Sequence, residues 1–394
     1  MTTAEIPAMP PLTDGGAEQL AWFNRMRAEQ PLWQDPNGGY RVFRHADVQS
    51  VLADPARFSS NFGRVMPFVD PARAGGNVLW ADPPAHRPLR QLVGQAFTAR
   101  TVAGLRPRIT EITRDLITAI PTDEFDFVEL LAYPMPVIVI AELLGVSPAD
   151  REFFRTCADK SLNLRVRKDQ SPEESAATVA NALKDLDGYL LEQVRNRRGA
   201  PTDDLLGTLT TAEVDGSRLT DLEIVSFATV LLNAGYMTTT LLLGNTLLCL
   251  RDNPSVAAQL RADRSLIPAA LVEVLRRRPP FPSVYRISTE EASIAGGTIP
   301  ANAFVAASVL SANHDERIFA QPERFDLHRE PNQHLGFGHG IHFCLGAPLA
   351  LLEVEIAVNL LLDTFADIEV SERVRLDKGE FYGTRRLPVS GRRS

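Results

Sequence analysis

One stretch decides the fold of this chain: Gly336-Phe337-Gly338-His339-Gly340-Ile341-His342-Phe343-Cys344-Leu345-Gly346. It places one thiol among four glycines, directly before the apolar helical pattern of residues 347–357. Glycine lets a backbone adopt positive φ and approach a flat ligand closely. Backbone N–H groups in the turn and at the helix start can donate to the sulfur and lower the pKa of the thiol. The stretch therefore predicts a buried, deprotonated thiolate, which suits a soft metal ion.

The other two cysteines differ in their surroundings. Cys157 and Cys249 lie in apolar helical patterns without Gly or His neighbours, and we expect both to be small buried hydrophobic residues. Around Cys344, residues Phe337, Gly340, Cys344 and Gly346 have the spacing Phe-x-x-Gly-x-x-x-Cys-x-Gly. This spacing resembles the haem-binding loop of the cytochrome P450 family. The resemblance implies that Cys344 is the axial ligand of haem b, with the other three residues binding the cofactor around it.

Composition narrows the class of protein. The chain has 394 residues, 44% of them hydrophobic, which is enough for a large core. A net charge of -8 argues against a nucleic-acid binder. Three cysteines without paired spacing fit a reducing cytoplasm. The start, residues 1–7, has no basic or apolar targeting region, and no run reaches about 18 apolar residues, so we expect neither a signal peptide nor a membrane anchor.

Helical periodicity dominates the chain. It predicts helices over residues 17–29, 45–53, 85–97, 102–119, 134–144, 149–161, 173–198, 220–251, 254–261, 265–277 and 347–364. Short β-like runs occur at residues 39–43, 283–287, 292–294 and 303–306, and residues 380–391 favour a further hairpin. We expect one mainly helical domain over residues 1–394 with a smaller β-rich lobe and a flexible start at 1–15. The family resemblance, which covers roughly residues 20–390, implies a triangular helical prism around a buried haem.

The longest helical pattern, residues 220–251, has an unusual centre. Ala234-Gly235-Tyr236-Met237-Thr238 puts glycine and a β-branched residue where helix propensity disfavours them. Close helix packing, or threonine bonding back to the preceding turn, would explain this without any function. The resemblance instead implies that Ala234, Gly235 and Thr238 cross the distal face of the haem. The small pair would leave a groove for dioxygen, and the threonine would orient water and relay protons.

Met237 departs from the family pattern, which usually has Asp or Glu just before the threonine. A thioether cannot donate or accept a useful proton. Three accounts stay open: a substrate group or ordered water replaces the acid, peroxide drives the reaction, or the reaction is not ordinary hydroxylation.

Two further groups of charged residues match the family. His86 and Arg90 lie four apart on one predicted helical face, a spacing that surface charge alone would also explain. The resemblance implies that these two bind the haem propionates together with Arg286 and His342. It also implies a buried ion network behind the haem loop, made of Glu273, Arg276 and Arg324.

The resemblance implies an activity and partners. The chain would be a haem-thiolate monooxygenase that hydroxylates or epoxidises a mostly apolar molecule in bacterial secondary metabolism. It would act as a cytoplasmic monomer with dioxygen and with electrons from a separate ferredoxin and its reductase, because the chain has no Gly-x-Gly-x-x-Gly after a strand. Arg100, Arg106 and Arg108 are either a docking patch for the ferredoxin or ordinary solvated arginines. The variable segment 61–80, the centre of the long helix, residues 281–284 and the turn 381–383 should line the substrate pocket. The first of these segments is made apolar by Phe62, Met66, Phe68, Val69 and Leu79.

Other classes remain as alternatives. A peroxygenase, an oxidative coupling enzyme or a nitrogen-oxide enzyme would keep the haem and explain Met237. A non-catalytic haem carrier or sensor would have no need of Gly235 and Thr238. A cysteine hydrolase would need a histidine base such as His342 and an orienting partner.

Overall fold

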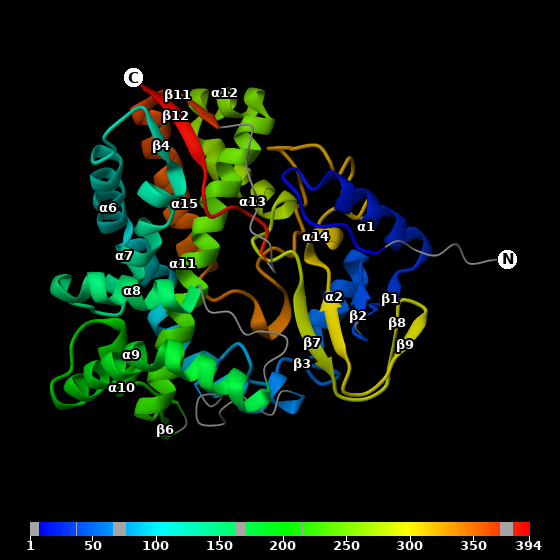
Figure 1. The fold of residues 1–394 in the computed structure, drawn as a ribbon, viewed down its shortest axis with the longest axis horizontal. Helices are drawn as coiled ribbons and strands as arrows, with labels where there is room; N and C mark the ends of the chain where they lie inside the picture. Colours follow the sequence, from blue (N-terminus) through cyan, green and yellow to red (C-terminus); the bar gives the residue numbers. More distant parts are fainter. Residues whose placement is uncertain (1–7, 37, 66–75, 163–170, 215, 371–380) are drawn as a thin grey trace.

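The structure, a computed structural model, describes residues 8–36, 38–65, 76–162, 171–214, 216–370 and 381–394. A large helical part and a smaller part built on a β-sheet lie side by side (Figure 1). The helices are α1 Ala17–Glu29, α2 His45–Ala53, α4 His86–Gly94, α5 Ala99–Gly104, α6 Arg106–Thr118, α7 Pro134–Leu143, α8 Arg151–Leu162, α9 Pro172–Gly199, α10 Leu205–Thr211, α11 Asp221–Asp252, α12 Pro254–Ala262, α13 Ile267–Arg277, α14 Val309–Ala312 and α15 Ala347–Thr364. The predicted class, mainly α with a smaller β-rich lobe, is confirmed.

Nearly every predicted helix is present within a few residues, because local signals set its ends. The side chain of Thr220 caps α11, and Glu223 completes a capping box there. One prediction differs: the helix expected over 102–119 is divided at Leu105 into α5 and α6. Pro107 has no N–H to continue the hydrogen bonds of α5, but it is well placed in the first turn of a new helix.

The main sheet has five strands in the order β1-β2-β10-β7-β3. Its strands are β1 Leu32–Gln34, β2 Tyr40–Val42, β3 Phe58–Ser59, β7 Val284–Ser288 and β10 Phe304–Ala307. β2 and β10 run parallel, and the other pairs are antiparallel. Two hairpins of short strands accompany it, β5 Glu213–Val214 with β6 Ser217–Arg218, and β8 Ala292–Ile294 with β9 Gly297–Ile299. β7 carries Arg286, one of the residues predicted to bind the haem propionates.

The hairpin predicted over residues 380–391 is wrong within the described part, which begins again at residue 381. A single strand, β12 Pro388–Arg393, lies between β11 Phe365–Val370 and β4 Glu124–Asp126 in a three-stranded sheet. The backbone N–H of Leu387 donates to Asp126, so this segment pairs with distant chain rather than with itself.

Part of the predicted flexible start, residues 1–7, falls outside the described residues. From residue 8 onward the start lies against the fold. The carboxylate of Asp14 forms ion pairs of 2.9 Å with Arg251 and with Arg278, near the end of α11.

Helix α11 runs through the middle of the helical part and packs against α7, α9, α13 and α15. Among the described helices it alone is long and apolar enough to cross a membrane, and 67% of the qualifying window is buried inside the protein. Burial of that kind is expected for the central helix of a large core. α11 therefore forms one wall of the space between this helix and the loop before α15.

Candidate active site

A cavity of about 510 Å³ separates α11 from the loop that carries Cys344. Its lining brings together most of the residues singled out in the sequence, although they come from four distant parts of the chain: Arg90, Ala234, Gly235, Thr238, Arg286, Phe337, His342, Cys344 and Gly346. Three predicted site residues, His86, Met237 and Gly340, do not line it.

The Cys344 loop is shaped by its glycines. Gly338 and Gly340 have φ of 74° and 71°, which L side chains rarely adopt. The N–H of Cys344 donates to the carbonyl of Phe337 over 2.9 Å and closes the turn. A Cβ at Gly340 would lie 2.7 Å from the carbonyl oxygen of Leu52 in α2. The structural requirement at Gly340 is therefore close contact with α2, outside the cavity.

The thiol itself differs from the sequence prediction of a lowered pKa. Burial raises the pKa of Cys344, and the N–H groups of Gly346 and Ala347 together with the nearby Arg90 only partly oppose this. The protein alone thus favours a protonated thiol in this pocket. A thiol that coordinates a metal ion is deprotonated by that bond, so the expected thiolate depends on the metal.

At one side of the cavity four nitrogen-bearing side chains gather, and two of them have a buried nitrogen without a hydrogen-bond partner among the described residues. The rings of His86 and His342 lie 4.6 Å apart, and the Nε2 atom of each is buried without a hydrogen bond among the described residues. Arg286 is buried and donates to the adjacent carbonyl of Tyr285, and Arg90 donates to the carbonyl of Phe343 over 2.6 Å. Burial and the neighbouring Arg286 lower the pKa of His342 to about 3, so its ring is neutral.

These groups fit the haem that the sequence predicts. Unpaired buried donors are costly, and carboxylates that enter from the ligand would satisfy them. His86, Arg90, Arg286 and His342 would hold the propionates of a haem in this cavity. The donor set and the thiol of Cys344, which lies on the same loop as His342, therefore agree with one another.

The central turn of α11 shows both packing features that could explain its sequence without any function, the threonine bond to the preceding turn and close helix packing. It also lines the cavity. The Oγ1 atom of Thr238 donates to the carbonyl of Ala234 over 2.7 Å. A Cβ at Gly235 would lie 2.8 Å from Cδ1 of Ile140, so the glycine permits close packing against α7. The same turn nevertheless lines the cavity.

Met237 points elsewhere. It is half-buried and packs against the main apolar core cluster, and it is not among the residues that line the cavity. An acid at this position would have to leave that apolar contact to reach the site.

Sequence reasoning missed a different acid, Glu353. It lies on α15, lines the cavity and is only 2% exposed. A signal was present, since position 353 shares the buried helical face of Leu349 and Ile356, where an acid is rare.

Behind the Cys344 loop the predicted ion network exists, with one member corrected. Glu273 and Arg276 are fully buried and bonded through two contacts of 2.8 Å. The third charge is Arg329, whose Nε lies 3.1 Å from Glu273. Arg324 is exposed and contributes its backbone carbonyl to Arg276. The prediction of Arg324 as the third charge is therefore wrong.

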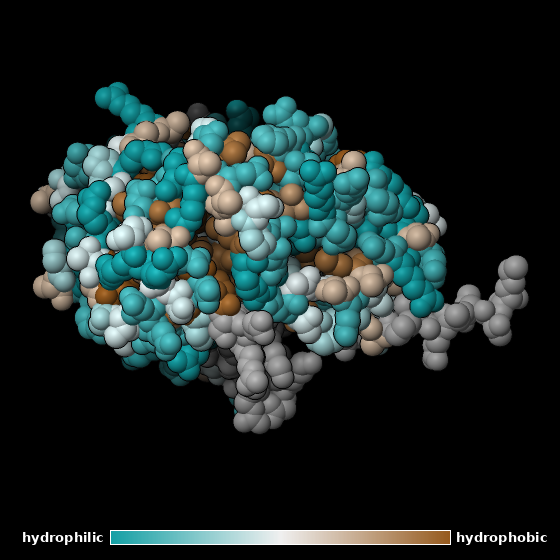
Figure 2. All heavy atoms as spheres, turned by 90° about the horizontal axis from the view of Figure 1, so that it is seen from above, coloured by the Kyte–Doolittle hydropathy of each residue, from teal (hydrophilic) through white to brown (hydrophobic). Residues whose placement is uncertain are grey.

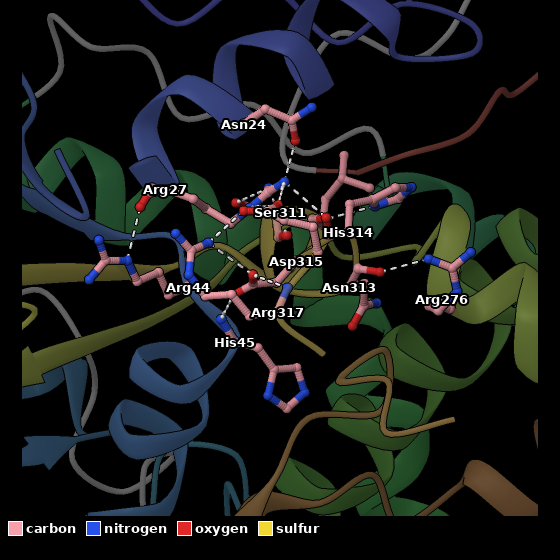
Figure 3. Close-up of polar contacts among 12 residues, drawn as sticks. Asn24, Arg27, Arg44, His45, Arg276, Ser311, Asn313, His314, Asp315 and Arg317 are labelled. Atoms are coloured by element: carbon pink, nitrogen blue, oxygen red, sulfur yellow. Dashed lines mark hydrogen bonds and ion pairs between the residues drawn. The ribbon is translucent and has the colours of Figure 1, made fainter. Parts of the chain in front are cut away.

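Asn313 joins this network to the loop, and Figure 3 shows its contact with Arg276. Its carbonyl accepts from Arg276 over 2.8 Å, and its side-chain oxygen accepts from the N–H of Leu335 over 2.7 Å. Leu335 directly precedes the glycine-rich stretch. On the other side, the fully buried Arg27 of α1 donates to the carbonyls of Ser311 and His314 and thus holds α1 on the same segment.

The rest of the cavity lining is mostly apolar. Its walls include residues of three predicted substrate segments: Phe62, Leu79 and Trp80, Val230, Leu231 and Ala234, and Phe281, Ser283 and Val284. Met66, Phe68 and Val69 lie outside the described residues. In the turn 381–383, the ring of Phe381 packs on Phe281 at 5.1 Å. Hydrophilic side chains cover most of the face in Figure 2, with hydrophobic ones showing near its middle.

Two of the three arginines of the predicted docking patch are engaged within the chain. Arg106 pairs with Glu355 at 3.0 Å, and Arg108 pairs with Glu142 at 2.6 Å. Arg100 is exposed, and the described residues offer it no ion pair.

Comparison with known proteins agrees with this geometry. The cytochrome P450 family model matches residues 32–381. The chain is 45% identical over 362 residues to the cyclomarin C epoxidase CymV of Salinispora arenicola, covering 91% of each chain. It is 43% identical over 394 residues to the erythromycin C-12 hydroxylase of Saccharopolyspora erythraea, covering 99% of this chain and 98% of that one. The solved ligand-free cytochrome P450 TbtJ1 superposes with a TM-score of 0.91 at 48% identity, over 98% of this chain and 100% of that one. The chain belongs to the cytochrome P450 family, whose members bind haem b through a cysteine thiolate.

Proposed function

We propose that this protein is a haem-thiolate monooxygenase that hydroxylates or epoxidises a mostly apolar organic molecule in the tailoring of a bacterial secondary metabolite. One observation carries the proposal: a single cavity has Cys344 on one wall, Gly235 and Thr238 on the opposite wall, and an apolar extension beside them. The relatives named epoxidase and hydroxylase support the reaction class.

Each group of residues would then have a role. Cys344 would hold the iron, and His86, Arg90, Arg286 and His342 would hold the propionates. Phe337 and Gly346 would shape the loop that bears the thiol, and Gly340 would keep that loop against α2. When bound, the haem supplies the activation of dioxygen that the side chains cannot.

The distal wall would manage dioxygen and protons. Ala234 and Gly235 have little or no side chain, so they leave space beside α11. Thr238 would hold water at the site, since its hydroxyl can both donate and accept. The hydroxyl of Thr238 donates its hydrogen to the carbonyl of Ala234, so the hydroxyl oxygen can accept a hydrogen bond from water.

The substrate would lie against Phe62, Trp80 and Phe281, which favour an apolar molecule over an ionic one. The protein would act as a monomer in the cytoplasm. A ferredoxin, reduced by its reductase, would supply electrons at the face near Phe343. That side chain is 48% exposed directly before Cys344, and Arg100 would help dock an acidic partner.

Non-standard haem chemistry, such as a peroxygenase or oxidative coupling reaction, is the second candidate. This candidate is considered because Met237 stands where the family usually has Asp or Glu. The two relatives described above are an epoxidase and a hydroxylase, so this alternative is not favoured. A haem carrier is less favoured still, because it would have no use for the apolar extension of the cavity.

The test combines a spectrum with turnover. The reduced, carbon-monoxide-bound protein should absorb near about 450 nm, as expected for axial thiolate ligation. With a ferredoxin, its reductase and candidate apolar metabolites, a product that has gained one oxygen atom should form. A histidine-type spectrum, or protein without haem, would contradict the proposal. Turnover with peroxide alone would favour the second candidate.

A further inference from the structure

Asn245 is a buried amide of α11 that the roles described above do not use. It has no solvent exposure and does not line the cavity. It follows Thr238 by seven residues and Leu242 by three, so the three side chains lie along one face of the helix. Thr238 and Leu242 line the cavity, and Asn245 continues the same stripe roughly 10 Å beyond Thr238.

The amide nitrogen of Asn245 joins two segments that are far apart in the sequence. Its Nδ2 atom donates to the carbonyl of Arg278 over 2.9 Å and to the carbonyl of Tyr382 over 2.8 Å. Both hydrogens of the amide are thereby used, and both acceptors are main-chain oxygens. The side-chain oxygen, Oδ1, is buried without a hydrogen-bond donor among the described residues, which lowers stability. The contacts that explain an asparagine here are therefore the two that its nitrogen makes.

Each of these segments leads directly to the substrate side of the cavity. Pro280 and Phe281 come soon after Arg278, and both line the cavity. Phe381 precedes Tyr382, and its ring packs on Phe281 with the ring centroids 5.1 Å apart. The N–H of Tyr382 donates to the carbonyl of Pro280 over 2.9 Å, so the two segments are also bonded to each other. A wall built from two loops is thus attached to α11 through the amide.

The contact between this wall and α11 is close. A Cβ at Gly383 would lie 2.6 Å from Cδ2 of Leu241 and 3.4 Å from Oδ1 of Asn245. The turn reaches the amide at this point because Gly383 has no side chain. Arg278 is anchored to the same helix a second time, since its guanidinium pairs over 2.8 Å with Asp252 at the end of α11. Both loops are therefore held at one distance from the helix.

We propose that Asn245 is a positioning residue for the reaction and sets the distance between the wall made by Phe281 and Phe381 and the turn of α11 that carries Thr238. The amide does not touch the substrate; it fixes the two loops against the helix. A substrate that rests on this wall then presents one part of its skeleton to the reacting centre, and small displacements of the wall change which part reacts. This role deepens the proposed function and rests on it, because the wall positions a substrate only if the cavity is a monooxygenase site.

The test measures the wall with two ligands that bind haem iron through an imidazole nitrogen. Imidazole extends little beyond the iron, whereas 4-phenylimidazole adds a phenyl ring that needs the apolar part of the cavity. Spectral titration of the holoprotein gives both dissociation constants, and their ratio reports the contact of the phenyl ring without the contribution of the iron bond. Each variant is first checked for the thiolate spectrum of its reduced, carbon-monoxide-bound form.

Asn245→Leu keeps the approximate size of the side chain and removes both hydrogen bonds. We expect it to lower the affinity for 4-phenylimidazole relative to imidazole about fivefold, as for the loosening of one aromatic contact. Gly383→Ala should act in the same direction, because its methyl group would displace the turn from Leu241, and it provides the test if Asn245→Leu does not fold. The matched control is Thr246→Val, which changes a buried neighbour whose Oγ1 donates to the carbonyl of Leu242 within α11 over 2.7 Å. Its ratio should equal that of the wild type.

An unchanged ratio in folded Asn245→Leu, or in Gly383→Ala where that variant has to serve, would overturn the proposal. An equal change in Thr246→Val would also overturn it, because any lost hydrogen bond of α11 would then have the same effect. So would a loss of affinity for imidazole as large as that for 4-phenylimidazole, which would place the effect at the haem rather than at the wall. Failure of the proposed function is seen separately, as a wild type that lacks the thiolate spectrum or forms no oxygenated product.

Discussion

The Nε atom of Arg329 lies 3.1 Å from Oε1 of Glu273, the same carboxylate oxygen that Arg276 contacts at 2.8 Å. Asn332 donates to the other oxygen over 3.0 Å. A carboxylate without solvent exposure thus has each oxygen satisfied by at least two donors. Because Arg276 also holds Asn313, and Asn313 holds Leu335, the position of the Cys344 loop depends on this acid.

Arg329→Ala should therefore weaken the protein at the thiolate side. It removes one charged hydrogen bond from a buried carboxylate, which typically costs about 1–3 kcal/mol of unfolding free energy. Urea unfolding of the holoprotein, followed by haem absorbance, measures this loss. The matched control is Arg324→Ala, whose side chain is exposed and should change stability by less than about 0.5 kcal/mol. Equal effects of the two substitutions would contradict the corrected network.

Sequence reasoning chose Arg324 because spacing along a loop does not reveal which side chain turns inward. The loop curls so that the carbonyls of Pro322 and Arg324 both accept from Arg276. This directs the Arg324 side chain outward, and Arg329 reaches back to Glu273. Such a choice depends on long-range backbone geometry, for which a single sequence carries no local signal.

The same distinction explains which parts of the fold were predictable. Caps and a 3.6-residue period are local, so α9 and α11 were expected nearly to their ends. The missed strands are short and form only through pairing with distant parts of the chain. Phe125 of β4, for example, pairs with Val389 of β12. Within the site, motif spacing identified Cys344, but the apolar contact of Met237 and the cavity position of Glu353 required the packing of α11 against its neighbours.

Cys344→Ser should abolish the absorption near about 450 nm in the reduced, carbon-monoxide-bound protein, because a hydroxyl cannot supply the electron-rich sulfur ligand. The comparison is Cys157→Ala, which changes a buried cysteine of α8 that does not line the cavity. That variant should keep the full thiolate spectrum. Retention of the band in Cys344→Ser, or its loss in Cys157→Ala, would show that another cysteine binds the iron.

Met237→Glu should fail to improve the coupling of the enzyme. The side chain at this position is half-buried against the apolar cluster rather than facing the cavity. A carboxyl group there loses hydration without a partner, so we expect about 1–3 kcal/mol less stability. Met237→Leu keeps the volume and the apolar contact and should cost less than about 1.5 kcal/mol. Product formed per NADPH, measured beside thermal unfolding, checks both; a clear gain in coupling for Met237→Glu would show that an acid at 237 does reach the site.

Glu353 also predicts how stability depends on pH. Burial raises its pKa from 4.5 to about 8 in the folded protein. Between these values the folded state keeps a proton that the unfolded state has released, so the unfolding free energy falls as pH rises. The loss begins above about pH 4.5, is complete near pH 8 and amounts to a few kcal/mol, on the order of one per pH unit.

Glu353→Gln isolates that contribution, because all other titrating groups are shared with the wild type. Unfolding free energies from urea titrations of the two holoproteins should diverge steadily from pH 5 to pH 8, with the wild type losing stability relative to the variant. Above pH 8 the difference should stay constant. Glu355→Gln, whose acid is paired with Arg106 at the surface, should run parallel to the wild type across this range. Parallel profiles for Glu353→Gln as well would mean that the carboxyl group is ionised in the folded protein.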